Sequence, residues 1–370
     1  MSKQIHIVSF DVPFPPDYGG VLDVYLRAKA LKQSGYSVIL HCYEYGRGRS
    51  HDFSQIADEI HYYDRKTGLK SLLSRLPYIV KSRNSSELLG RILSDSAPIL
   101  LEGQHNTFWA GELQKHKRSF AIRMHNIEWQ YYADLAKSSK TYSERLFFGM
   151  EARKLKRQEL TLKKIPVLCI SESDRQYYDQ LGFHAVYLPV TIDSDLVLEP
   201  VEGERFALFH GNLSVAENLE AIQRLITENR QNPLGIPVVI AGKNPGKQLV
   251  SKIENEGWKC IANPSDSEMN DLLRSCSVHL LIGFKSAGIK LKVIRALLSG
   301  KPCIATEEML GNQTFEKYCE LWNPTFPLAE KIEHLPIPDE QEIRKRVNEL
   351  EAAFGIEKLE AAFREIGLSQ

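Results

Sequence analysis

The chain has 370 residues, 43% of them hydrophobic, with 47 basic and 47 acidic side chains. This composition is typical of globular proteins and excludes a disordered chain, a collagen-like chain and a small disulfide scaffold. The length favours two domains. Because the net charge is zero, we do not expect nucleic acid as a partner.

The charge is divided unevenly along the chain. Residues 1–200 carry four more basic than acidic side chains, and residues 201–370 carry four more acidic than basic ones. This asymmetry indicates two domains with different partners, although drift of surface residues would produce the same split.

The cysteines and the N-terminus indicate a location inside the cell. No C-x-x-C pair is present, and free thiols in apolar stretches are typical of a reducing compartment. The first residues alternate like a strand and lack the layout of a signal peptide. No apolar run approaches the ~20 residues that span a bilayer. We expect a cytoplasmic protein, at most peripheral to the inner face of the membrane.

Strand-like and helix-like segments alternate along the whole chain. The first half predicts a helix at 21–34 and strands at 4–10, 37–43, 98–102, 120–124, 166–170 and 185–188. The second half predicts a helix at 289–299 and strands at 206–210, 237–241, 258–261, 278–283 and 302–305. Nearly continuous apolar strands are typical of parallel sheets covered by helices on both faces. The fold class is therefore α/β, with two Rossmann-like doubly wound domains.

A polar linker containing Pro200 and Gly203 separates the two halves. We expect an N-terminal domain at 1–195 and a C-terminal domain at 205–340. The tail at 341–370 is charge-rich and predicts a terminal helix.

The first strand is followed by a loop that ends in Gly19 and Gly20 and then by a helix. Such a strand–loop–helix junction lets the backbone approach a phosphate or a substrate. An ordinary tight loop is equally compatible with these residues. The G-x-G-x-x-G fingerprint of dinucleotide-binding proteins is absent.

Three places in the second half have a similar character. Gly211 follows a strand, and Lys243 follows another strand that ends in glycine. A plain turn and a solvated lysine are the ordinary alternatives for these two. The third place is a small-residue loop with Ser286 and Gly288, after which a helix begins near Lys290. Free N–H groups and lysines at a helix start favour a diphosphate.

Taken together and in order, these segments resemble the GT-B glycosyltransferases of the family-four type. Gly288–Thr306 is similar to the variant donor motif G-I-K-L-K-V-L-E-A-L-A-x-G-K-P-V-V of that family. The loop Asp11–Gly20 resembles its Gly-Gly loop, and Phe209–Asn218 resembles its G-x-L-x(4)-N motif. Val239–Pro245 resembles its I-x-G-x-x-P strand end, and Arg123–Glu128 resembles its R-x-H-N-x-E block. The resemblance covers about residues 1–310.

This resemblance implies two Rossmann-like domains that face a cleft, with the acceptor bound by the N-terminal domain and a nucleoside-diphosphate sugar bound by the C-terminal domain. It implies a sugar transfer in glycan or surface polysaccharide synthesis, with retention of configuration. It also implies that the terminal helix packs back toward the N-terminal domain. The sugar nucleotide would be a substrate, and no cofactor or bound metal is expected.

One departure from the family concerns its Glu-x7-Glu pair, which here becomes Ala287 and Arg295. Arg295 cannot accept hydrogen bonds from ribose hydroxyls. It would contact a donor phosphate, lie outside the pocket, or mark lost activity. A catalytically degenerate binding protein and a GT-B nucleotide-sugar epimerase are therefore the alternative functions.

Two histidines follow predicted strands of the N-terminal half, where ligands bind in α/β folds. They are His105 and His125, and each is as compatible with a structural role as with a catalytic one. The resemblance implies a histidine near the donor sugar. Glu102 and Glu128 are the nearest carboxylates, and either would serve as base in an inverting reaction.

Residues 65–91 contain seven basic side chains and a single acidic one, interleaved with apolar residues. A second basic group occupies 153–164. Such segments are compatible with an anionic membrane surface or a lipid-diphosphate acceptor, and equally with solvated helices.

Overall fold

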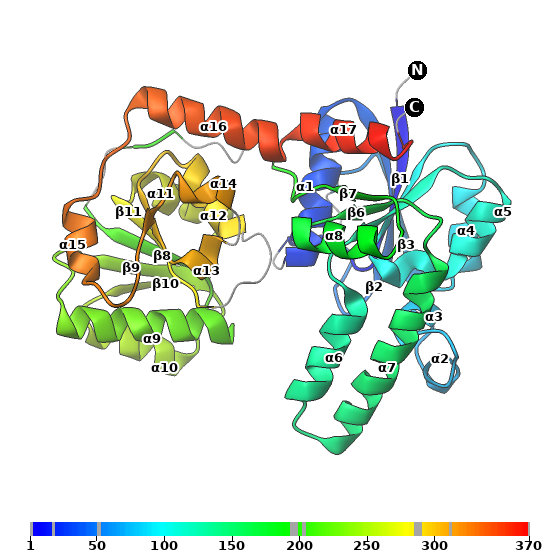
Figure 1. Cartoon of the computed structure of the whole chain (residues 1–370), viewed down its shortest axis with the longest axis horizontal. Coiled ribbons are helices and arrows are strands. Elements are labelled where there is room, and N and C mark those ends of the chain that lie inside the picture. The colour runs from blue at the N-terminus through cyan, green and yellow to red at the C-terminus, as the bar shows by residue number, and fades with distance from the viewer. Residues whose placement is uncertain are drawn as a thin grey trace. The chain divides into compact units, whose positions relative to one another are not determined.

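A computed structural model describes residues 3–16, 19–49, 53–192, 199–201, 205–284, 291–310 and 313–368 (Figure 1). The chain divides into two compact units. The first contains residues 1–193 and 354–370, and the second contains 194–353. Among the described helices, none is both long and apolar enough to cross a membrane.

The first unit is built on a parallel seven-stranded sheet in the order β3-β2-β1-β4-β5-β6-β7. Its strands are β1 (Lys3–Ser9), β2 (Tyr36–Glu44), β3 (Glu59–Asp64), β4 (Ile99–Glu102), β5 (Phe120–Met124), β6 (Val167–Cys169) and β7 (Ala185–Tyr187). The chain reverses its direction of winding between β1 and β4. Ligands bind α/β sheets at such a switch point, beyond the carboxyl ends of the strands.

The helices of the first unit cover both faces of this sheet (Figure 1). They are α1 (Gly19–Gln33), α2 (Leu69–Leu72), α3 (Tyr78–Lys81), α4 (Ser86–Ile92), the 3₁₀ helix η1 (Gln104–Trp109), α5 (Ala110–Lys115), α6 (Glu128–Ser138), α7 (Tyr142–Thr161), α8 (Glu172–Gln180) and α17 (Ile356–Glu365). Helices α6 and α7 form a hairpin that extends away from the sheet. Two apolar clusters, one containing Leu40 and Phe363 and the other Leu101 and Tyr178, form the core.

The second unit repeats this plan with six parallel strands in the order β10-β9-β8-β11-β12-β13. The strands are β8 (Ala207–Asn212), β9 (Val238–Lys243), β10 (Lys259–Ala262), β11 (Val278–Leu281), β12 (Cys303–Ala305) and β13 (Glu320–Leu321). Its switch point lies between β8 and β11.

Helices of different lengths accompany the sheet of the second unit. They are α9 (Ala216–Gln231), α10 (Lys247–Asn255), α11 (Asp266–Ser275), α12 (Leu291–Leu298), α13 (Glu307–Leu310), α14 (Gln313–Glu316), α15 (Leu328–Glu333) and α16 (Glu340–Phe354). The predicted terminal helix is two helices, because Gly355 separates α16 from α17. Helix α16 belongs to the second unit, and α17 packs its buried Leu359 and Phe363 into the core of the first.

Two strands escaped the sequence analysis, and both are at sheet edges. β3 is partly exposed and mixes charged with aromatic residues, so it lacks the apolar run of a central strand. β13 has only two residues. An edge strand need not be apolar on both faces, and in these two strands the apolar run that identified the other strands is missing.

The sequence left two interpretations of the basic segment 65–91 open, a lipid-facing amphipathic surface and solvated helices, and in the structure the segment is partly buried. It forms three short helices, and Leu69 and Leu73 are indeed exposed, at 73% and 81%. However, Val80 is fully buried and Arg83 is 3% exposed. Arg83 is buried because its guanidinium donates hydrogen bonds to the carbonyl oxygens of Ile79 and Phe10, both at 2.8 Å.

Candidate functional site

The carboxyl ends of β1, β4 and β5 bring two of the predicted site residues together. β4 pairs with both β1 and β5, so the loops that follow these three strands are neighbours. Phe10 follows β1, and its ring contacts both His105 and His125, with ring centroids 5.4 and 5.3 Å apart. Both histidines therefore adjoin one aromatic ring at the switch point of the first sheet.

Below this edge lies a group of charged and polar side chains, which we call the paired cluster: Asp23, Arg27, Glu102, Arg123 and His125. The first four are fully buried, and the His125 side chain is 8% exposed. Arg27 donates to Asp23 at 2.9 Å and to Glu102 at 2.8 Å. Arg123 donates to Asp23 at 3.0 Å. Asp23 and Arg27 are one turn apart on α1, so the helix presents both to the strand ends.

The paired cluster balances its own charge. Burial by itself would raise the pKa of Asp23, but the guanidinium groups of Arg123 and Arg27 hold it well below its usual range. The pKa of Glu102 is likewise lowered, because Arg27 and His125 outweigh its burial. Both carboxylates are therefore ionised, and two guanidinium groups neutralise them.

His125 is held inside the paired cluster. Its Nε2 donates to Glu102 at 2.8 Å, and its Nδ1 lies 3.4 Å from Asp23. A carboxylate facing each nitrogen fixes the orientation of the ring. His125 is thus better placed to orient its neighbours than to exchange a proton with a substrate.

Asp23, Glu102 and His125 also have the spacing of a metal site, with ligand atoms within 4.8 Å of one another. Their surroundings do not fit a cation. Arg27 and Arg123 already occupy the carboxylate oxygens, and a divalent ion would add positive charge beside two guanidinium groups. We therefore derive no metal chemistry from this group.

His105 and Glu128 form a second, less constrained pair. His105 Nδ1 lies 3.9 Å from Glu128 Oε1, and the His105 side chain is 21% exposed. Burial raises the pKa of Glu128 to about 7, and burial lowers the pKa of His105 well below its usual range. Near neutral pH, Glu128 can therefore accept or donate a proton, as general acid–base catalysis requires.

Gly103 sets the position of His105 and was not identified from the sequence. Its φ is +77°, and a Cβ on it would lie 2.8 Å from His105 Nδ1. Any side chain here would push the ring away from Glu128. A glycine directly after an apolar strand is the signal that could have revealed it.

The predicted glycine loop is only partly described. α1 begins at Gly19, and no atom of the other described residues, apart from its chain neighbours and its own helix backbone, would lie within 4 Å of a Cβ on Gly19. Gly20 follows it in the same first turn of α1 and is partly buried. Open space at a helix start leaves room for a ligand beside free N–H groups.

In the second unit, the carboxyl end of β8 holds an imidazole without hydrogen-bond partners. His210 is 5% exposed, and within the described ranges neither of its ring nitrogens has a hydrogen-bond partner. Burial lowers its pKa well below the usual range, and the nearby His279, Arg295 and Lys292 lower it further. His210 was not predicted, although a histidine directly before Gly211 at a strand end is a recognisable signal.

Lys292 and Arg295 approach this strand end from α12. Lys292 Nζ donates to Asn218 at 3.2 Å and lies 5.2 Å from the centroid of the Phe209 ring. Arg295 donates to Asn270 at 2.8 Å, and burial lowers its pKa. We call His210, Lys292 and Arg295 the cationic strand end.

The two predicted loop residues of this sheet differ in their surroundings. Gly211 packs against Asn218, whose Nδ2 would lie 3.0 Å from a Cβ on Gly211. Lys243 ends β9 and is exposed. Gly242 must remain glycine, because a Cβ would lie 1.8 Å from the carbonyl oxygen of Gly211. Ser286, Gly288 and Lys290, with Ala287, lie outside the described residues.

Comparison with known proteins extends these observations. No protein-family model matches the chain. An uncharacterised 44.6 kDa protein in the cps region of Klebsiella pneumoniae is 23% identical over an alignment of 320 residues. The match covers 80% of this chain and 80% of that protein.

Solved structures share the fold. HepE from Anabaena, in complex with UDP and glucose, is similar at a TM-score of 0.63 and 14% identity, over 98% of both chains. A trehalose-6-phosphate protein from E. coli bound with UDP-2-fluoro glucose is similar at a TM-score of 0.55 and 14% identity, over 98% of this chain and 96% of the other. These structures are GT-B glycosyltransferases, so the predicted fold class is confirmed.

Proposed function

We propose that the protein is a glycosyltransferase that transfers a sugar from a nucleoside-diphosphate sugar to a glycan or lipid-linked acceptor. The observation that carries this proposal is the cationic strand end at the switch point of the second sheet. There Lys292 and Arg295 flank the buried, unpartnered His210. Two cationic side chains that converge on one strand end favour an anionic ligand.

The diphosphate of a donor sugar is the ligand that fits this charge best. In glycosyl transfer the leaving diphosphate gains negative charge, and preorganised cations lower the barrier to its departure. HepE and the E. coli protein, which share the fold, were solved with UDP or a UDP sugar. We therefore propose a UDP sugar as donor, with Gly211, Lys243 and the loop at 285–290 also contributing to its site.

Glu128 and His105 are the proposed proton-transfer pair. Glu128 has its pKa near neutrality, and His105 lies beside it with an unpartnered Nδ1. In a retaining transfer the leaving phosphate accepts the acceptor proton, and this pair would position the acceptor hydroxyl. In an inverting transfer Glu128 would take the proton. His125, held by Glu102, is the proposed positioning residue.

The acceptor is proposed to be anionic or membrane-borne. On α7, Leu146 and Met150 are 51% and 44% exposed, and basic residues follow them at 153–157. Lys154 Nζ donates to the carbonyl oxygen of Leu72 at 3.2 Å, so this helix adjoins the exposed leucines of α2. Exposed apolar and basic side chains on one surface favour anionic lipid headgroups. The cps-region relative supports a role in surface polysaccharide synthesis. We propose the inner face of the membrane as the place of this reaction.

The test is transfer from UDP sugars. Purified protein is incubated with UDP-glucose, UDP-galactose and related donors, with membrane lipid extract as acceptor, and released UDP is measured. The proposal predicts UDP release that depends on the acceptor and is lost in Lys292→Met. If nucleotide binds without any transfer, the chain is a binding protein, the alternative that Arg295 at the position of a family glutamate favours. If no nucleotide binds, both readings fail.

Membrane contact is tested separately by flotation with vesicles. Vesicles that contain about one third anionic lipid should carry the wild-type protein upward, and neutral vesicles should not. A double variant, Leu146→Ser and Met150→Ser, should stay at the bottom of the gradient. Equal flotation of this variant would refute the membrane proposal and leave the donor proposal intact.

A further inference from the structure

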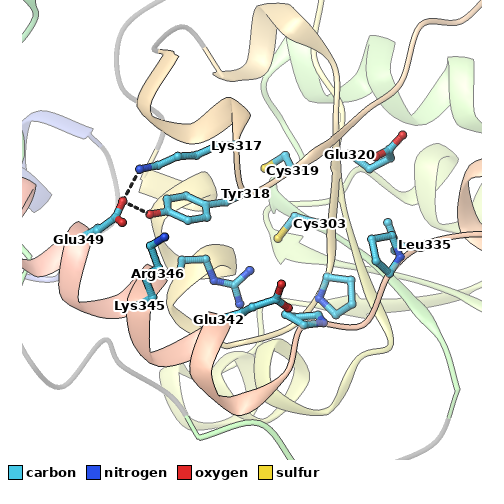
Figure 2. A pocket seen from close by; sticks show the side chains of 13 residues that line it. Cys303, Lys317, Tyr318, Cys319, Glu320, Leu335, Glu342, Lys345, Arg346 and Glu349 are labelled. Carbon is cyan, nitrogen blue, oxygen red and sulfur yellow. Dashed lines mark hydrogen bonds and ion pairs between the residues drawn. The ribbon is translucent and has the colours of Figure 1, made fainter.

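A cavity opens in the second unit, at the amino ends of β12 and β13. It has a volume of about 430 Å³ and is lined by Cys303, Cys319 and side chains of α16 (Figure 2). The cationic strand end lies at the carboxyl ends of the same sheet. The two places therefore lie at opposite ends of the parallel strands, and no residue of the cationic strand end lines this cavity.

Arg346 is the unusual member of this cavity. It projects from α16 toward the strands and is 4% exposed (Figure 2). In the part of the chain that the structure describes, its Nε and Nη2 have no hydrogen-bond partner. Its Nη1 reaches only the carbonyl oxygen of Lys301, at 3.5 Å, the outer limit of a hydrogen bond. A buried guanidinium that lacks an anion is costly, because its desolvation is not repaid.

The carboxylates around the cavity are engaged elsewhere. Glu349 accepts hydrogen bonds from Lys317 and from the Tyr318 hydroxyl, as Figure 2 shows. Glu320 is paired with Lys331. Glu342 accepts the backbone N–H of Asp339 at 3.0 Å. Among the described residues, no carboxylate oxygen lies within 4.0 Å of Arg346, and Lys345 adds a further positive charge to the rim.

We propose that this cavity binds a small organic anion whose single oxyanion head, a phosphate or a carboxylate, pairs with Arg346. Guanidinium groups match both heads through parallel N–H bonds. The volume exceeds that of a bare ion and falls in the range of small-molecule sites. The prolines and Leu335 of the lining would contact the carbon skeleton of the ligand.

Binding there would join α16 to the sheet of the second unit. Because α16 ends at Phe354, where the chain enters the first unit, the occupied site would stiffen the helix that links the two units. The cavity is thus placed to couple a metabolite to the stability of that link.

The experiment measures binding to the intact protein by calorimetry and thermal shift, with inorganic phosphate, glucose 1-phosphate and the monocarboxylate butyrate as probes. We expect saturable binding of at least one probe and an increase in the melting temperature. Arg346→Met should weaken that binding by about tenfold or more, since a hydrogen bond to a charged group is lost. Arg344→Met is the matched control, because Arg344 is on the same helix, exposed and paired with Glu340.

The pattern across the probes identifies the head group, and UDP separates this site from the donor site. Arg346→Met should leave UDP binding unchanged. Absence of binding by all three probes would overturn the proposal, as would equal binding by wild type and Arg346→Met. If Arg346→Met does not fold, the same titrations are made with Lys345→Met. The proposal then requires that this variant bind the probes severalfold more weakly than the wild type.

Discussion

The two sheets present opposite electrostatic arrangements at the same topological position. At the switch point of the first sheet, two carboxylates and two guanidinium groups of the paired cluster neutralise each other. At the switch point of the second, Lys292 and Arg295 adjoin a neutral, unpartnered His210. In the first arrangement carboxylates and guanidinium groups are equal in number, whereas the second is the place where we propose that an anionic ligand binds.

This difference separates scaffold from binding site. A buried charge network that is fully paired holds its members in place and offers nothing to a ligand. In the first unit, the chemistry is therefore left to the groups at its margin, His105 and Glu128. In the second unit, the cations themselves face the proposed diphosphate.

The largest expected effect comes from opening the paired cluster. Arg27→Met leaves Asp23 and Glu102 without their shared guanidinium, which should lower the free energy of unfolding by about 3–5 kcal/mol. Chemical denaturation measures this. Lys115→Met, which breaks an exposed pair with Glu112, should cost well under 1 kcal/mol. Similar losses in both variants would show that the cluster is no scaffold.

The two carboxylates of the first unit should respond differently. Glu128→Gln removes the group whose pKa is about 7 and should lower the transfer rate about 100-fold, with little change in stability. Glu102→Gln should instead destabilise the fold. In an inverting reaction the wild-type rate should rise as pH passes about 7, because Glu128 must be ionised to accept the proton. A Glu128→Gln variant with normal activity would remove Glu128 from catalysis.

The cationic strand end should affect affinity rather than stability. Lys292→Met is expected to weaken UDP binding about tenfold, since it removes a charged donor to the phosphates. Calorimetry with UDP measures the change. Lys259→Met, at the amino end of the same sheet, serves as the control and should bind UDP like the wild type. Equal weakening in both variants would point to a general charge effect and not to a site.

The smallest effect concerns acid stability. His210 has its pKa well below 6.5 in the folded protein, so below pH 6.5 the unfolded chain takes up a proton that the folded chain does not. The free energy of unfolding should therefore fall as pH decreases, by up to about 1.4 kcal/mol per pH unit from this group. His210→Leu should flatten the profile between pH 6.5 and 5. An unchanged slope would show that His210 is not held neutral.

Sequence reasoning identified the two sheets because most of their strands are nearly continuous apolar runs that alternate with helical segments. It missed β3 and β13, where edge position removes that signal. It also missed the paired cluster, because Asp23 and Arg27 lie within a helix whose apolar spacing was the visible feature. Their i,i+4 spacing was present in the sequence, but only the pairing of β4 with β5 brings Glu102 and Arg123 to them.

The residues of the candidate site likewise fall into those that the sequence could reveal and those that it could not. Glycines and lysines after strands can be recognised along the chain, since each depends on its immediate neighbours. The raised pKa of Glu128 and the isolation of His210 depend on burial by residues distant in sequence. The same is true of Arg346, which the sequence presents as one charge among many in a polar helix.

The most direct test of the central claim is calorimetric titration of the intact protein with UDP. If the second unit binds a nucleoside diphosphate through its cationic strand end, wild type and Lys259→Met will show the same saturable binding, and Lys292→Met will bind about tenfold more weakly. Absence of UDP binding in the wild type, or equal affinity in Lys292→Met, would contradict the account.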